Sequence, residues 1–169
     1  MIKRTFFIVL FLALGSLNTL GQTSDNAEIN VSATVIGSTQ NSIELITVNT
    51  IQFGNAQPIN GQININPINS LNAGFMIAEG NPDAEFRLNY LPDRILNQTN
   101  GNGSLTFTYL ISGNDEEDQA TSELLDLENR NLRFNEEGRY YIWVGGQIDL
   151  SNAAPGNYEG DFTIEIDYI

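Results

Sequence analysis

The sequence predicts an all-β protein, built as an antiparallel sandwich or barrel, from two observations. Apolar and polar residues alternate in several short stretches, and clusters of Gly and Asn separate those stretches. Alternation indicates a sheet with one buried face, because successive side chains of a strand point to opposite faces. Gly and Asn supply the positive φ angles that tight turns need. Short strands at this spacing favour a sandwich or a barrel.

Residues 1–21 are expected to be a cleaved signal peptide. Lys3 and Arg4 precede an apolar stretch over residues 5–14, and small or polar residues follow up to Gly21. The apolar stretch is shorter than the roughly 20 residues that a membrane-spanning helix needs. The chain has no Cys to carry a lipid anchor. We therefore expect export to the periplasm, the cell surface or the medium, without membrane insertion.

Residues 22–26 are expected to form a short polar leader, and residues 27–169 a single domain. Alternating strands are expected over residues 29–35, 43–49, 62–66, 85–90, 105–109 and 161–168. No linker and no repeat of domain size interrupts this pattern.

Two stretches of the domain depart from alternation. Residues 140–144 are apolar on both parities, so this strand either is covered on both faces or exposes aromatic rings on one side. Gly145 and Gly146 follow directly and suit a bulge or a sharp bend. Residues 121–127 are the one stretch that suits a helical turn, capped by Thr121 or Ser122.

The composition excludes several classes of function. The chain has 169 residues with no His and no Cys, which excludes Ser-His-Asp, Cys-His and thiolate chemistry and ordinary zinc sites. With 21 Asp+Glu against 7 Lys+Arg, the net charge of −14 makes the chain a poor binder of nucleic acid and of anionic lipid. We expect a protein that is not an enzyme and that holds no metal or cofactor.

The charged residues admit alternatives that we weigh against plain solvated surface. Residues 115–118 form the densest acidic run and would suit Ca²⁺, but they lack the ligand spacing of an EF-hand loop, so a solvated loop is preferred. A carboxylate pair could hydrolyse a glycosidic bond, although some pair will be suitably spaced by chance. Asp93 with Arg94, and Glu137 with Arg139, are interpreted as surface ion pairs of small net value.

Tyr141 and Trp143 are candidate ligand-stacking residues. They share one parity of the strand at residues 140–144, and flat aromatic faces pack well on sugar rings. Core packing is the preferred interpretation because the apolar run is continuous. A stacking role requires a concave surface on which both rings are exposed.

The two ends of the processed chain carry the candidate strand-pairing interface. One unbroken apolar face runs through the last strand, and a similar face runs through the first. The residues are Phe162, Ile164, Ile166 and Tyr168 at the C-terminal end, and Ile29, Val31, Ala33 and Val35 at the N-terminal end. Terminal strands of this kind pair within their own sheet or with the open edge of a neighbouring molecule, and the residues leave both alternatives open.

The C-terminal segment from Gly156 to Tyr168 resembles a family signature, Gly-x-Tyr-x-Gly-x-[Phe/Tyr]-x-[Val/Ile]-x-[Val/Ile]-x-Tyr. It belongs to an uncharacterised family of exported bacterial proteins, a domain of unknown function. Residues 30–35, residues 51–54 with 61–67, and residues 141–148 resemble further elements of that family. The family is similar to spore coat protein U and to chaperone–usher pilin subunits.

The resemblance implies an incomplete, immunoglobulin-like β-sandwich that is completed by an N-terminal strand from another subunit. It places Gly156 and the four apolar C-terminal residues beside the open groove, and the four N-terminal apolar residues on the donated strand. Pilins commonly have a disulfide, and this chain has no Cys. The leader is also too short to be a separate donor, so residues 27–36 either donate or complete their own sheet.

The function expected from these observations is that of an exported, non-enzymatic surface or fimbria-like structural or adhesion subunit. It would act by β-strand addition, with identical subunits or an assembly chaperone as partners. The alternative is a self-contained secreted binding module, for example for glycans, that uses Tyr141 and Trp143.

Overall fold

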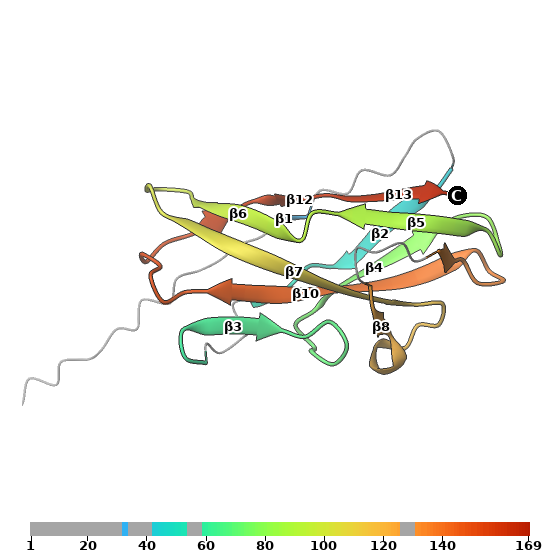
Figure 1. The fold of residues 1–169 in the computed structure, drawn as a ribbon, viewed down its shortest axis with the longest axis horizontal. Coiled ribbons are helices and arrows are strands. Elements are labelled where there is room, and N and C mark those ends of the chain that lie inside the picture. Colours follow the sequence, from blue (N-terminus) through green and yellow to red (C-terminus); the bar gives the residue numbers. More distant parts are fainter. Residues whose placement is uncertain (1–31, 34–41, 54–58, 126–130) are drawn as a thin grey trace, which may run out of the picture.

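The computed structural model describes residues 32–33, 42–53, 59–125 and 131–169. Over these residues the chain is an antiparallel β-sandwich with a larger and a smaller sheet, which confirms the predicted fold class (Figure 1). The expected signal peptide and leader, residues 1–26, lie outside the described residues. No helix in the described part of the chain has the length and apolar character needed to cross a bilayer.

Eight strands form the larger sheet, with β7 and β10 as its long central pair. Their spatial order is β11 (Tyr158–Glu159), β6 (Asp93–Gln98), β7 (Ser104–Asn114), β10 (Arg139–Asp149), β4 (Gly74–Glu79) and β2 (Glu44–Asn49), with β3 (Gln62–Ile65) also beside β10 and β8 (Glu123–Leu124) beside β7.

The smaller sheet holds the C-terminal strand. Its order is β13 (Ile164–Tyr168), β5 (Glu85–Tyr90) and β9 (Leu132–Arg133). A separate pairing joins β1 (Ser32–Ala33) in parallel to β12 (Asp161–Phe162), the short strand just before β13. The first and last described segments of the chain therefore lie side by side.

Strand β10 is covered on both of its faces, as its sequence allowed. Tyr140, Ile142 and Val144 join the main core, whereas Tyr141 and Trp143 are buried on the opposite face. Continuous apolar character is what a strand covered on both sides requires.

The pairing of β10 with β7 shows no bulge at Gly145 and Gly146. The register of β10 with β7 runs without a shift from Tyr141 to Ile148. Instead, β10 changes its neighbour on the other side at this point, from β4 to β3. A Cβ at Gly145 would collide with the carbonyl oxygen of Ile65, so close backbone approach is the reason for this glycine.

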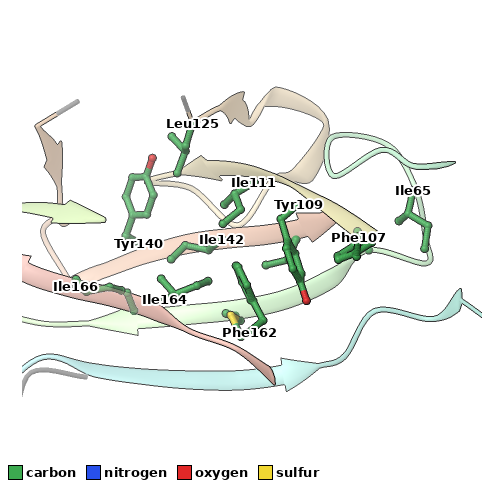
Figure 2. Close-up of a cluster of buried hydrophobic side chains, with 14 of the residues drawn as sticks. Ile65, Phe107, Tyr109, Ile111, Leu125, Tyr140, Ile142, Phe162, Ile164 and Ile166 are labelled. Atoms are coloured by element: carbon green, nitrogen blue, oxygen red, sulfur yellow. The ribbon is translucent and has the colours of Figure 1, made fainter. Parts of the chain in front are cut away.

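Aromatic rings connect the two sheets through the core. Tyr109 of β7 stacks on Phe162 of β12 with ring centroids 3.8 Å apart, and its edge packs against Phe107 (Figure 2). Phe86 of the smaller sheet stacks on Phe134 and packs edge-on against Tyr140 of the larger sheet. These contacts fix the two sheets face to face over one continuous core.

The helical turn expected over residues 121–127 is wrong for the residues described. The 3₁₀ turn η2 spans Gln119–Thr121 instead, and residues Glu123–Leu124 form β8. Asp118 is the cap, because its side chain accepts a hydrogen bond from the Ala120 N–H (3.0 Å). The Ser122 hydroxyl donates a hydrogen bond to the buried Ser112 hydroxyl (2.9 Å). Ser122 has an extended backbone and leads directly into β8.

The Tyr109–Phe162 stack generates a stability prediction. Phe162→Ala should lower the free energy of unfolding by about 3–5 kcal/mol, because it leaves a cavity against a fully buried ring. Urea unfolding followed by the fluorescence of Trp143 measures the loss. Glu159→Ala, at an exposed position of β11, should change stability by less than about 0.5 kcal/mol. A loss below about 1 kcal/mol for Phe162→Ala would contradict the proposed packing.

Candidate functional site

The C-terminal edge of the sandwich brings together four of the predicted interface residues. Phe162, Ile164 and Ile166 are buried, and they place one parity of β12 and β13 in the core. Tyr168 is partly buried, and its hydroxyl accepts a hydrogen bond from the Asn81 N–H (2.7 Å). The end of the chain is thereby attached at both its apolar face and its last aromatic ring.

Gly156 lies apart from this face. It occupies the turn before β11, where its φ of +149° falls in the region that favours glycine and a Cβ would meet the side chain of Gln98. The Gln98 amide donates to the carbonyl oxygen of Pro155 (2.9 Å), which closes the turn against β6. Gly156 therefore has a turn function at the other edge of the larger sheet.

The N-terminal interface residues fall mostly outside the described part of the chain. Ile29, Val31 and Val35 are not described, and Ala33 is the second residue of β1. Ala33 pairs with Phe162 in the parallel register, and Ser32 pairs with Asp161. The structure thus shows β1 pairing, over these two residues, with β12, the short strand just before the last strand of its own chain.

The backbone of β13 has one paired side. Its neighbour is β5, and the Ile169 N–H continues this pairing by donating to the Glu85 carbonyl oxygen (3.2 Å). Because N–H groups alternate in direction along a strand, those of Glu165 and Asp167 point to β5 and those of Ile164, Ile166 and Tyr168 point away. Within the described ranges, no strand pairs with that second side of β13.

A small cavity lies between β2 and the ring of Phe162. It measures about 20 Å³ and is lined by residues of β2, including Thr47, and by Met76, Tyr109 and Phe162. A cavity of this size holds about one water molecule. The cavity therefore lies between the edge strand β2 and the buried stack of Tyr109 on Phe162.

Tyr141 and Trp143 are packed into a row of rings and do not form the open stacking platform that a sugar site requires. Phe75 of β4 stacks against both, with ring centroids 6.3 Å from Tyr141 and 5.2 Å from Trp143. Each of the two side chains is only 6% exposed. A hollow of about 280 Å³ beside Trp143 reaches little of its ring.

The Gln119 side chain of η2 lines the same hollow as Phe75 and Trp143, and it is called the cover of this aromatic row. The Gln119 amide donates to the carbonyl oxygens of Pro67 (2.7 Å) and Ser70 (3.0 Å), which joins η2 to the segment between β3 and β4. At the far end of the row, Arg139 bonds Tyr141 and Glu79, and these contacts raise the pKa of the Arg139 guanidinium above its ordinary value. The row is a second small core on the outer face of the larger sheet.

The acidic run at residues 115–118 is an exposed loop. The Asn135 side-chain amide donates to the Asp115 carbonyl oxygen (2.9 Å), and Asp118 caps η2. The described residues contain no group of three or more acidic side chains placed to hold a metal ion.

Sequence reasoning misplaced Arg94. Adjacent residues of a strand point to opposite faces, so Asp93 and Arg94 cannot face each other across β6. Asp93 accepts a hydrogen bond from the Thr108 hydroxyl (2.7 Å), and Arg94 points to the same side as buried Leu96. The signal for this orientation was the shared parity of Arg94 and Leu96. Glu137, by contrast, does lie 3.6 Å from the Arg139 guanidinium.

The family matched by this chain covers residues 44–168 and is described as a domain of unknown function, DUF4402. The chain belongs to this family. The DUF4402 match begins at the first residue of β2 and ends at the last residue of β13, so β1 lies outside it. Comparisons with curated proteins and with solved structures give no match.

The cover over Trp143 generates a spectroscopic prediction. Gln119→Ala removes both hydrogen bonds of the cover, so quenching of the fluorescence of Trp143 by acrylamide should increase and its emission should shift to the red. Trp143 is the only Trp of the chain, so its signal is not mixed with another. Gln147→Ala, at an exposed position of the same strand, should leave both unchanged. Equal quenching in the two variants would show that Gln119 does not shield Trp143 from solvent.

Proposed function

We propose that this DUF4402 protein is an exported, non-enzymatic structural or adhesion subunit that assembles by β-strand addition along β12 and β13. One observation carries the proposal. The last strand has a buried apolar face and one side without a described neighbour, and β1, from outside the family match, pairs beside it at β12.

Strand addition uses both backbone and side chains of this edge. The N–H groups of Ile164, Ile166 and Tyr168 point toward the added strand and give affinity through main-chain hydrogen bonds. Alternate side chains of the added strand give register, because one parity faces the core. Ile29, Val31 and Val35 share the parity of Ala33, which already pairs with Phe162.

Two further points support the proposal. The segment at residues 1–21 has the charge and apolar pattern of a signal peptide, which fits export. The C-terminal pattern resembles that of chaperone–usher pilin subunits, in which an N-terminal strand completes the sandwich of the next subunit. The partner that fits best is therefore an identical subunit that contributes residues 27–36.

Removing residues 22–36 from the processed chain should leave a folded domain that no longer assembles. The full processed chain should form oligomers by light scattering, whereas the shortened chain should be a monomer with an unchanged β-sheet circular dichroism spectrum. A peptide of residues 27–36, added to the shortened chain, should bind and protect the amides of Ile164, Ile166 and Tyr168 from hydrogen exchange.

Two control peptides test the register. The changes Val31→Asp and Ala33→Asp should abolish binding, because the proposed pairing turns these two side chains toward the core. Ser32→Asp and Thr34→Asp should be tolerated. The proposal fails if the full processed chain is a uniform monomer and the shortened chain unfolds, since β1 would then only complete its own sheet.

A further inference from the structure

A second surface feature lies near the start of β13. It is a hollow of about 450 Å³ between the connection from β5 to β6 and the junction of β12 with β13. Its lining residues are Asn89, Tyr90, Leu91, Arg94, Thr163 and Glu165. Ligand sites of small molecules start at about 300 Å³, so the hollow can hold one or two sugar rings.

Arg94 is the unusual residue of this hollow. Arg133 and Arg139 form ion pairs with Glu85 (2.9 Å) and Glu79 (3.1 Å). Arg94 forms none with any described residue, and its Nε is buried without a hydrogen-bond partner in the described part of the chain. Partial burial of an unpaired cation is costly, and it is unexpected in a chain with 21 acidic residues. The buried Nε is closed to a ligand, so a ligand in the hollow would bond the terminal nitrogens of this guanidinium, which form no ion pair within the described residues.

The other polar groups restrict what that ligand can be. Glu165 lines the same hollow but lies beyond ion-pair distance of Arg94, so a positive and a negative group stand apart within one site. A simple anion satisfies Arg94 but meets the Glu165 carboxylate. A neutral sugar donates to Glu165 but leaves the Arg94 charge without a counter-charge.

A hydroxylated ring that carries one carboxylate satisfies both groups. Its carboxylate accepts from the two terminal nitrogens of Arg94, a pairing that suits a planar carboxylate. Its hydroxyls donate to Glu165 and bond the Asn89 amide and the Thr163 hydroxyl. The side chain of Leu91, which is 59% exposed, offers an apolar surface to the C–H face of the ring.

We propose that this hollow binds uronic-acid residues of an acidic polysaccharide. The site does not depend on strand addition, because none of its groups belongs to the unpaired backbone side of β13. A subunit with this site would attach to acidic glycans, and a chain that never assembles could bind them equally well.

Sodium glucuronate, titrated into the ¹⁵N-labelled processed chain and followed by NMR, tests the proposal. Amide shifts should concentrate at Asn89, Leu91, Thr163 and Glu165 and should saturate. Glucose, which lacks the carboxylate, and acetate, which lacks the ring, should each bind about tenfold more weakly or worse. Equal binding of acetate would indicate a plain anion site, and equal binding of glucose would remove the role of Arg94; either result overturns the proposal.

Three variants assign the contacts. Arg94→Gln should weaken glucuronate binding by about tenfold or more. Arg87→Gln makes the same change of charge at an exposed position of β5 that does not line the hollow, and it should leave binding unchanged. Glu165→Gln should weaken glucuronate but not acetate. Thermal unfolding of each variant controls for folding, and equal affinities of Arg94→Gln and Arg87→Gln, or no saturable shifts with glucuronate, would refute the site.

Discussion

The contact between Tyr109 and Phe162 is the constraint on which the rest of the sandwich depends. The two rings lie nearly parallel, at 14°, and belong to β7 in the centre of the larger sheet and to β12 near the end of the chain. Tyr109 also packs against Phe107 (Figure 2). Phe162 packs edge-to-face with Tyr90. A ring only seven residues before Ile169 is thus held in the middle of the core.

This constraint also determines what the edge of the molecule can offer. Because Phe162, Ile164 and Ile166 are fixed inward, the intervening residues of β12 and β13 face outward and the backbone runs along the rim between the two sheets. One rim therefore presents main-chain groups for a further strand. The same inward anchoring positions Thr163 and Glu165 beside Arg94, so the two proposed sites share a scaffold but use different atoms.

Alternation in the sequence was sufficient to predict β3, β5 and β13, whose inner parity is buried and outer parity polar. It could not reveal β4, because both parities of this strand are apolar. Phe75 and Ile77 are partly buried on the outer face, where Phe75 packs in the aromatic row, and Met76 and Ala78 lie in the core. The cover supplied by Gln119 comes from a segment 24 residues before Trp143, and no local pattern announces such a contact. Arg94 was misread for a different reason, because no strand was predicted over residues 93–98 and its shared parity with buried Leu96 was not used.

Native-state hydrogen exchange of the last strand tests the central claim most directly. If Phe162 and its neighbours lock β13 into the core, the amides of Glu165, Asp167 and Ile169, which point to β5, will exchange as slowly as those of β10 and only through global unfolding. Exchange of these three amides at the rate of an exposed loop, while β10 stays protected, would show a C-terminal strand that frays from a core closed without it.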